Sequence, residues 1–431
     1  MKWAFYNILF LLVYPFLLPG FLVRMLRRGG YAARMGDRFA LYPEAALAFA
    51  RGPRPIWIHA VSVGEVQVAG QLMREWRAVD PDVRFVFSTT SSTGWKMAEK
   101  EVERLGGKGG VMLIYNPLDF PTFVIAALRT FNPRAIVLTE SEIWPNFIRR
   151  AKKTGIPLFL INARVSDRSA PRYKAARWFF GELFESFTKI FAQSELDADR
   201  IRATYRAPAT NIEVAGSFKF DVAVRNPGKE AELADWIRPE GRKILLGGST
   251  WPGEDAVLLD IYRKLSDDVL LVIAPRHFEK ADAIEANIKA AGYACVRRSR
   301  GDRPSASCTT RQVYLADTTG ELMGLYGLAE VVFVGKSLCA HGSQNMIEPC
   351  LCGKPTLVGP YTENFRPVMS DLLAAQAITQ VKDAAELETR ILAAFAGEES
   401  TAANAKAAVE KRCGVVARCV AEIRTLIPAS R

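Results

Sequence analysis

One carboxylate, Glu65, lies where a predicted strand changes into a predicted helix, in the stretch WIHAVSVGEVQVAGQLMREW at residues 57–76. Ser62 is a residue type that caps helices, and Gly64 permits a tight turn with a ligand close to the backbone. A carboxylate at such a turn could accept a proton as a general base. It could also simply stabilise the helix through its dipole, by about 0.3–1 kcal/mol. The pattern alone leaves both roles open.

Three more charged side chains follow predicted strands in the first half of the chain. Glu140 and Glu142 end the strand in VLTESEIWPN. They are two residues apart, so one could line a ligand site while the other faces solvent. Lys219 follows a short predicted strand in VAGSFKFD and could meet an anion. An ordinary solvated charge is the alternative for each of the three.

Candidate anion-binding groups follow predicted strands in the second half. Arg276 and His277 come directly after the strand in VIAPRHFEKA, and the fork of an arginine guanidinium suits phosphate or carboxylate. Residues 247–250 (GGST) and 318–321 (TTGE) each precede a predicted helix, whose first N–H groups are free to bind an anion. Neither stretch matches a P-loop or a G-x-G-x-x-G pattern, so each alone is a weak signal.

A glycine-rich turn in GKSLCAHGSQNMIEP leads into another predicted helix. Asn345 stands at the start of that helix and Glu348 three residues later. A glutamate at this spacing can complete a capping box. Alternatively its carboxylate could hold the hydroxyls of a ribose, with a phosphate at the helix N-terminus.

The elements that would position these residues alternate between apolar strands and amphipathic helices. Strands that are apolar throughout, such as those in PIWIHAVSV, AIVLTE and DVLLVIAPR, are typical of a parallel α/β sheet buried on both faces. The alternation restarts after a Pro- and Gly-containing stretch. We therefore expect an N-terminal domain at residues 29–222, a linker with a short helix at 223–242, and a C-terminal domain with terminal helices at 243–431. Ligands of such sheets bind at the carboxyl ends of the strands, so Glu65 is predicted to point into a cleft between the domains.

The overall charge favours an anionic partner. The net charge is +11, which suits nucleic acid, an acidic membrane surface or a phosphorylated substrate. No basic and aromatic stripe or known module indicates nucleic acid, and we expect no such partner. The seven cysteines are odd in number and the histidines are only three, so we expect reduced thiols in a cytosolic compartment and no zinc site.

The N-terminus carries a membrane signal. Residues 3–23 contain no charge, and their length is enough to cross a bilayer once. Four arginines follow at positions 24, 27, 28 and 34, so the positive-inside rule places the remainder in the cytoplasm. We expect residues 1–28 to form an anchor, either a spanning helix or one that dips into a single leaflet. The protein would then lie at a bacterial inner membrane with its catalytic domains facing the cytoplasm.

Together these segments resemble one family, the 3-deoxy-D-manno-oct-2-ulosonic acid (Kdo) transferases of lipid A biosynthesis. The matching strings occur in order along nearly the whole chain: HAVSVGEV, TTSSTGW, TESEIWPN, NARVSDRS, AQSELDADR, GSFKFD, GGSTWPGED, APRHFEK, DTTGELMGLYGLAEVVFVGKSL, GSQNMIEP and GPYTENFRPV. Such a series is far more specific than any one motif. The chain departs from the commonest family form at Lys336, Gln344 and Met346, where a glycine, a histidine and a proline are expected.

The resemblance implies a GT-B glycosyltransferase, with two Rossmann-like domains that face each other across a cleft and an N-terminal anchor. Its donor would be CMP-Kdo, and its acceptor the phosphorylated lipid A precursor lipid IVA, without a metal ion or another cofactor. The general base would be Glu65, and a pair that stabilises the transition state would be Glu140 and Lys219. The implied contacts to CMP are Pro275, Arg276, Thr319, Gly320, Glu321, Asn345, Met346, Ile347 and Glu348. A single displacement would invert the anomeric carbon.

Two other functions remain open from the sequence. One is a GT-B transferase that uses a different nucleotide-sugar on a membrane lipid. The other is a membrane-tethered protein that binds NAD or an anion without transfer activity, although the missing G-x-G-x-x-G after the first strand counts against it. The sequence does not fix the number of Kdo units, the acyl-chain preference or the oligomeric state.

Overall fold

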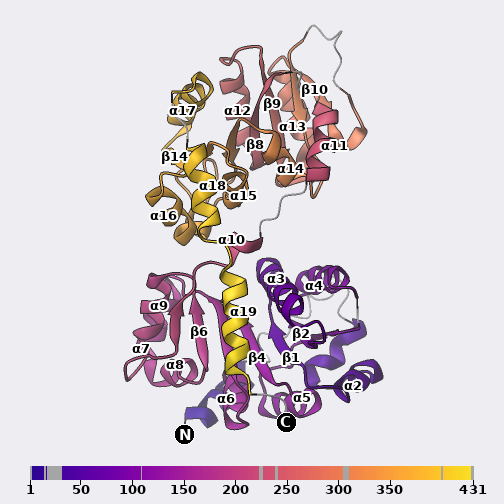
Figure 1. The fold of residues 1–431 in the computed structure, drawn as a ribbon, viewed down its shortest axis with the longest axis vertical. Helices are drawn as coiled ribbons and strands as arrows, with labels where there is room; N and C mark the ends of the chain where they lie inside the picture. Colours follow the sequence, from indigo (N-terminus) through magenta and orange to yellow (C-terminus); the bar gives the residue numbers. More distant parts are fainter. Residues whose placement is uncertain are drawn as a thin grey trace. The chain divides into compact units, whose positions relative to one another are not determined.

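The chain folds into two compact units, each built on a parallel sheet covered by helices (Figure 1). The computed structural model describes residues 2–13, 16, 32–107, 109–222, 227–237, 241–303, 310–398 and 401–428. Unit 1 comprises Met1–Val222 and Gly414–Arg431, and unit 2 comprises Ala223–Cys413. The predicted change of domain near residue 222 coincides with the boundary between the units.

The sheet of unit 1 has the strand order β3-β2-β1-β4-β5-β6-β7, and every neighbouring pair is parallel. Its strands β1, β2, β4 and β5 are buried along their full length, which explains their continuous apolar sequences. The strands are β1 (Ile56–His59), β2 (Phe85–Thr89), β3 (Val111–Tyr115), β4 (Ala135–Thr139), β5 (Leu158–Ala163), β6 (Lys189–Ala192) and β7 (Ile212–Val214).

Helices of unit 1 pack on both faces of this sheet. One face carries a core shared by α3, α4 and the C-terminal α19, and the other a core shared by α2, α5, α6 and α8. The bounds are η1 (Ala32–Phe39), α2 (Glu44–Ala50), α3 (Val63–Val79), α4 (Ser92–Arg104), α5 (Pro121–Phe131), α6 (Pro145–Lys153), α7 (Ser169–Ala175), α8 (Arg177–Phe184), α9 (Glu195–Arg202), α10 (Lys219–Val222) and α19 (Val415–Leu426).

The position of α19 differs from the expected domain boundary. We expected all terminal helices in the C-terminal domain, but α19, yellow in Figure 1, belongs to unit 1. Its apolar face, including Val416, Val420 and Ile423, joins the core that contains the buried face of α3. Asp221 accepts hydrogen bonds from the backbone N–H groups of Gly414 and Val416, at 2.6 and 2.7 Å. The helix is therefore held by both a buried apolar face and a capped N-terminus.

Unit 2 repeats the same architecture, with the strand order β10-β11-β9-β8-β12-β13-β14, again all parallel. Its strands are β8 (Lys243–Thr250), β9 (Val269–Pro275), β10 (Ala294–Arg297), β11 (Gln312–Leu315), β12 (Val331–Val334), β13 (Thr356–Val358) and β14 (Thr379–Gln380). Its helices are α11 (Pro227–Ile237), α12 (Glu254–Tyr262), η2 (Phe278–Lys280), α13 (Ala281–Ala290), η3 (Arg298–Arg300), α14 (Leu322–Leu328), α15 (Ile347–Leu351), η4 (Glu363–Phe365), α16 (Arg366–Ala374), α17 (Ala384–Ala396) and α18 (Ala402–Glu410).

Residues 2–13 form a helix that packs against unit 1 through one side. Trp3 and Tyr6 contact the core beneath α8, and the Tyr6 hydroxyl donates to Asp119 at 3.0 Å. Residues on the other side are exposed: Phe5, Ile8, Leu9, Leu11, Leu12 and Val13. None of the helices in the described ranges is long and apolar enough to cross a bilayer. Residues 14, 15 and 17–31, on which the second half of the expected anchor falls, lie outside those ranges.

Candidate active site

The two predicted acids of unit 1 lie at the carboxyl ends of neighbouring strands. β1 and β4 are adjacent in the sheet, and the strand order reverses between them. Such a reversal is where open α/β sheets bind their ligands. Glu65 follows β1 in the first turn of α3, and Glu140 comes directly after β4. The topology thus places both carboxylates at the predicted binding position.

The Glu65 side chain is held at one oxygen only. Its Oε2 accepts a hydrogen bond from the Val61 N–H at 3.0 Å and lies 3.0 Å from the buried Thr139 hydroxyl. Its Oε1 has no hydrogen-bond partner among the described residues. We expected this carboxylate to point into a cleft; it is instead folded back over its own turn, and the residue is only 7% exposed. One oxygen fixes the orientation, and the other can accept a proton.

The loop before Glu65 is supported by the segment TTSSTGW. Ser91 caps α4 and also donates to the Val61 carbonyl at 3.0 Å. A side chain at Gly94 would come within 2.6 Å of that carbonyl and 2.5 Å of Thr89 Oγ1, so only glycine allows this approach. Ser62 caps α3 through the Glu65 N–H, as expected. These contacts show how the string TTSSTGW supports the loop formed by HAVSVGEV.

Glu140 occupies a strained and partly buried position. Its φ of 51° lies in the left-handed region that L-residues with a side chain rarely adopt. Burial, followed by the nearby negative charge of Glu65, raises the pKa of Glu140, whereas Lys219 and Arg164 lower it. Asn162 donates to Glu140 Oε1 at 3.3 Å. The charge of Glu142 also raises the pKa of Glu140, so the carboxylate is surrounded by two acids, two cations and one amide.

Lys219 begins the short helix α10 and faces the same carboxylate. Burial lowers its pKa, while the charge of Glu140 raises it and that of Arg164 lowers it further. The neighbouring Phe218 N–H donates to Asn162 Oδ1 at 3.1 Å. The structure thus brings together Glu65, Glu140 and Lys219, the three predicted catalytic residues of unit 1.

Sequence reasoning gave no role to three residues around this cluster: Thr139, Asn162 and Arg164. Asn162 and Arg164 belong to the string NARVSDRS, which begins inside β5, the strand next to β4, and continues past its end. Their position at the carboxyl end of a strand beside β4 was the available signal. Glu142 takes a different direction from Glu140, as the two-residue spacing predicted. Its carboxylate accepts from Trp144 Nε1 at 2.9 Å and lies 3.7 Å from the buried His59 Nε2.

Unit 2 contains a cavity of about 130 Å³ at the carboxyl ends of β8, β9 and β11. Five residues predicted to contact a nucleotide line it: Pro275, Arg276, Thr319, Gly320 and Glu321. Within the described part of the chain, the exposed Arg276 guanidinium has no ion-pair partner. Gly320 has a φ of 83°, and no atom lies within 4 Å of the place where its Cβ would be. The cavity therefore offers an available cation and open space beside a glycine backbone.

Glu321 lies at this cavity, but its carboxylate is already engaged. It pairs with Arg298 at 3.0 Å and Lys229 at 2.9 Å, and the Thr318 hydroxyl also donates to it. Burial alone would raise the pKa of Glu321, but these bonds outweigh it and lower the pKa to about 2. An anionic ligand would gain nothing from this carboxylate. For a phosphate, position 321 therefore offers its backbone rather than its carboxylate.

The other four predicted nucleotide contacts lie at the start of α15 and do not line this cavity. Asn345 Oδ1 accepts from the Ile347 N–H at 3.1 Å, and its Nδ2 donates to Glu348 Oε1 at 3.0 Å. Burial raises the pKa of Glu348 above its ordinary value. Met346 and Ile347 are fully buried, so their side chains belong to the core. Asn345 and Glu348 remain candidates for polar contacts, whereas Met346 and Ile347 could contribute only backbone groups.

Comparison with known proteins identifies the family. The profile of a family described as "3-Deoxy-D-manno-octulosonic-acid transferase (kdotransferase)" matches residues 33–222. A 3-deoxy-D-manno-octulosonic acid transferase from Haemophilus influenzae is 30% identical over 401 residues, which are 92% of this chain and 91% of that protein. One from Bordetella pertussis is 33% identical over 371 residues, or 82% and 83% of the two chains. The chain belongs to the Kdo transferase family.

As a Kdo transferase, the protein is a glycosyltransferase, and its fold is shared with proteins of other activity. The solved UDP-GlcNAc 2-epimerase from Neisseria meningitidis, bound to UDP-GlcNAc, covers 86% of this chain and 100% of its own, with a TM-score of 0.60. The two proteins are only 14% identical. The likeness agrees with two Rossmann-like domains and says nothing about substrate.

The Kdo transferase secures the segment GKSL in unit 2 with one buried carboxylate. Glu254 accepts from the backbone N–H groups of Trp251 and Lys336 through Oε2, at 2.7 and 2.9 Å. Its Oε1 accepts from Ser337 and Leu338, both at 3.1 Å. Lys336 tolerates a left-handed φ of 56° there, and its ammonium lies 4.9 Å from the centre of the Trp251 ring. The lysine that departs from the usual glycine is therefore accommodated without loss of the loop.

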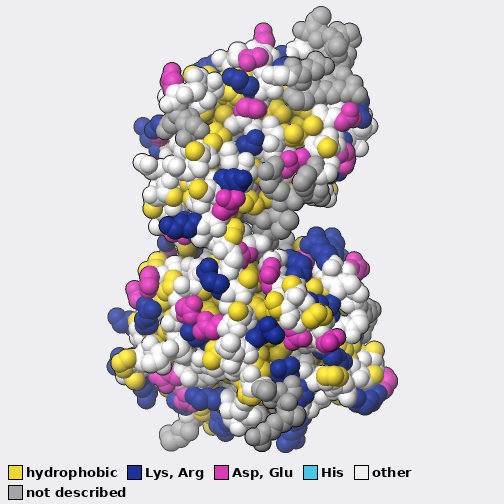
Figure 2. All heavy atoms as spheres, viewed as in Figure 1, with side chains coloured by type: hydrophobic (Ala, Val, Ile, Leu, Met, Phe, Trp, Pro, Cys, Tyr) yellow, Lys and Arg dark blue, Asp and Glu magenta, His cyan; other side chains and the backbone are white. Residues whose placement is uncertain are grey.

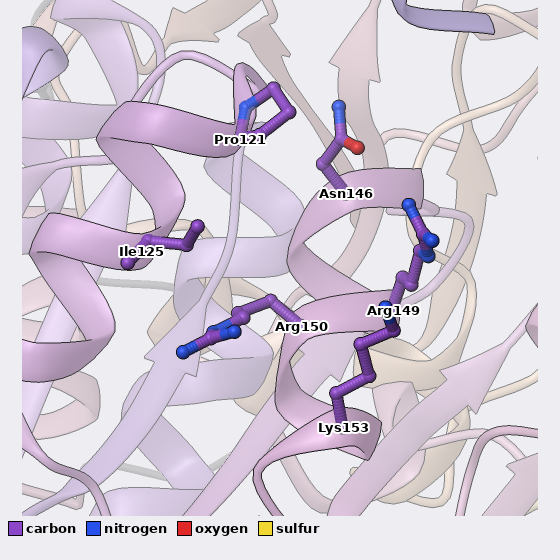
Figure 3. Close-up of a pocket in the computed structure, with 6 residues that line it drawn as sticks. All are labelled: Pro121, Ile125, Asn146, Arg149, Arg150 and Lys153. Carbon is purple, nitrogen blue, oxygen red and sulfur yellow. The ribbon is translucent and has the colours of Figure 1, made fainter. Parts of the chain in front are cut away.

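Unit 1 of the Kdo transferase also has a basic pocket of about 100 Å³ between α5 and α6 (Figure 3). Arg149, Arg150 and Lys153 extend from α6, while Ile125 lines the α5 side, and Figure 3 shows Arg150 reaching toward it. The Arg149 guanidinium lies 4.5 Å from the centre of the Trp3 ring in the N-terminal helix. The pocket thus adjoins the helix whose other side exposes apolar residues.

Proposed function

We propose that this protein transfers Kdo from CMP-Kdo to lipid IVA, the phosphorylated precursor of lipid A in lipopolysaccharide biosynthesis. Membership of the Kdo transferase family supports Kdo as the transferred sugar. The observation that carries the chemistry is the meeting of Glu65, Glu140 and Lys219 at the point where the strand order of unit 1 reverses.

Glu65 acts as the general base. The acceptor's primary hydroxyl attacks the anomeric carbon of Kdo, the bond from that carbon to the phosphate oxygen breaks, and the hydroxyl proton passes to Glu65 Oε1. This oxygen suits the role because the turn and Thr139 hold only Oε2. A single displacement of this kind inverts the anomeric carbon, from a β donor to an α product.

The pair Glu140 and Lys219 stabilises the charges that develop during transfer. As CMP leaves, positive charge grows on the sugar ring and negative charge on the phosphate. A carboxylate and an ammonium that are already oriented stabilise such charges without reorganisation. Mutual attraction supports the charged state of both groups against the effect of burial.

The donor's nucleotide binds to unit 2. Arg276 and the backbone N–H groups at Thr319 and Gly320 hold the phosphate, and Glu348 holds the ribose hydroxyls. The unpaired guanidinium at the cavity and the polar pair of Asn345 with Glu348 support this assignment. Positive side chains would replace a metal ion at the leaving group, so we propose that transfer needs no metal.

The acceptor and the anionic surface of the bacterial inner membrane bind unit 1 from the cytoplasmic side. The basic pocket of Figure 3 and the exposed apolar side of residues 2–13 support this placement, because lipid A precursors carry phosphates and acyl chains. Lys and Arg side chains are interspersed with Asp and Glu on the face seen in Figure 2, which favours local anchoring over a continuous nucleic-acid stripe.

The test is to incubate the purified protein with CMP-Kdo and lipid IVA in chelator and to weigh the lipid product. A gain of one or more Kdo masses is expected, and an unchanged lipid would refute the proposal. Substitution of UDP- or ADP-sugars for CMP-Kdo tests the alternative donor. Product with one of those donors and none with CMP-Kdo would assign the protein to a different transfer reaction.

A further inference from the structure

Asn162 occupies a conformation that few residues adopt. It lies in β5 and is fully buried, with a φ of 51° in the left-handed region. Asparagine is one of the few residues with a side chain that enters this region readily. Its backbone carbonyl accepts from Gln193 Nε2 at 2.8 Å, so the main chain is fixed as well.

The two ends of the Asn162 amide can be assigned from their partners. The Phe218 N–H can only donate, so the atom 3.1 Å from it must be the amide oxygen. The amide nitrogen therefore faces Glu140 Oε1, at 3.3 Å. This end can only donate, which suits an ionised carboxylate. The Asn162 side chain consequently connects Glu140 with Phe218, the residue directly before Lys219.

We propose that Asn162 is a positioning residue that orients the Glu140 carboxylate toward Lys219 through the hydrogen bond that it donates. The inference rests on the proposed function, in which this pair stabilises the transition state. Asn162 acts on the reaction through Glu140 and need not touch either substrate.

The charged groups around Glu140 come from several elements and set what a change at position 162 would do. Glu65 on α3 and Glu142 after β4 oppose the ionised form of Glu140, while Lys219 on α10 and Arg164 after β5 favour it. The Asn162 amide favours the ionised form through its donated hydrogen bond. Replacing that donor with an acceptor should therefore disfavour the ionised form of Glu140 and raise its pKa.

The test variant is Asn162→Asp, which keeps the shape and the acceptor for the Phe218 N–H. Its second oxygen would face Glu140 without a proton to donate, so the pKa of Glu140 should rise. We expect the acidic limb of the kcat profile to move upward by at least about one pH unit, and kcat at a fixed pH on that limb to fall about tenfold. KM for CMP-Kdo should stay within about twofold, because the nucleotide contacts lie in unit 2.

The matched control is Asn132→Asp. Asn132 also has a left-handed φ, of 39°, but it is exposed at the end of α5. This variant should retain the wild-type profile. If Asn162→Asp does not fold, Asn162→Gly keeps the backbone conformation and removes the donor, and it should move the acidic limb in the same direction. An unshifted limb in the folded variant, or an equal shift in Asn132→Asp, would overturn the inference.

A measurement without turnover separates this inference from the proposed function. The Glu140 carboxyl carbon can be titrated by NMR, with its signal assigned by loss in Glu140→Gln. A higher pKa in Asn162→Asp than in wild type supports the positioning role even if no Kdo is transferred, whereas equal values contradict it. Wild-type protein that fails to modify lipid IVA would contradict only the proposed function.

Discussion

Replacement of Glu65 by glutamine should remove the catalytic base and leave the fold intact. The glutamine carbonyl oxygen can accept the same two hydrogen bonds, from the Val61 N–H and the Thr139 hydroxyl. The amide nitrogen would then replace Oε1 and cannot accept a proton. General-base catalysis contributes about 10²–10⁴-fold, so kcat should fall by this factor, which corresponds to about 2.7–5.4 kcal/mol in activation free energy.

The loss should appear in kcat and hardly in donor affinity. CMP affinity measured by calorimetry should remain within about twofold, because the proposed nucleotide contacts lie in unit 2. The same substitution removes a negative charge beside Glu140, so the pKa of Glu140 should fall. The melting temperature should change little, since the two hydrogen bonds at this position are retained.

Glu75→Gln is a suitable control because Glu75 lies on the same helix and, among the residues that the structure describes, accepts a hydrogen bond from Gln71 alone. This variant should keep the wild-type kcat. A kcat in Glu65→Gln that stays within about threefold of wild type would refute the assignment of the base. So would a loss of activity that parallels a loss of folded protein.

Three further outcomes are expected. Arg276→Ala should weaken CMP binding about 10–100-fold in calorimetry, by loss of a charge-assisted hydrogen bond, while Arg263→Ala, directly after α12, should not. Unchanged affinity would remove Arg276 from the phosphate site. Glu254→Gln should destabilise unit 2 by about 2–4 kcal/mol, because the amide nitrogen would oppose buried N–H donors, and an unchanged melting temperature in calorimetry would contradict this. Burial raises the pKa of Asp119 from 3.8 to about 7, so the folded state favours the protonated acid. The free energy of unfolding should therefore decrease as pH rises from about 4 to about 7. Asp119→Asn should abolish this slope in thermal unfolding, and an identical slope would exclude Asp119 as its source.

Strands within long apolar runs were the most predictable part of the fold. The apolar runs ending at His59, Thr139 and Pro275 predicted β1, β4 and β9, because strands covered on both faces need no polar residue. The partly exposed strands β6, β10 and β14 were not predicted, since their sequences KIFA, ACVR and TQ contain charged or polar residues and form no continuous apolar run. The placement of α19 was also missed, because its apolar stripe fits either unit equally well from sequence.

The candidate site was predictable to the level of position and less so to the level of side-chain direction. Strand ends indicated where Glu65, Glu140 and Lys219 each lie in unit 1, whereas the pairing of Glu140 with Lys219 came from the family resemblance. The pattern could not show that Glu65 folds back onto Val61, because a hydrogen bond to its own turn leaves no mark on spacing. Nor could it show that the Glu321 carboxylate is paired with Arg298, which is 23 residues away in the chain.

The return of α19 to unit 1 determines the order in which the protein can be completed during synthesis. Residues 223–413 of unit 2 are continuous and leave the ribosome before Val415–Leu426 does. Until those last residues emerge, the face of α3 that they cover is open to water, chaperones and proteases. Unit 1 thus begins to fold before unit 2 but is completed after it. Deletion of the 18 residues 414–431 would disrupt the hydrophobic core around α3, whose residues are synthesised some 350 residues earlier.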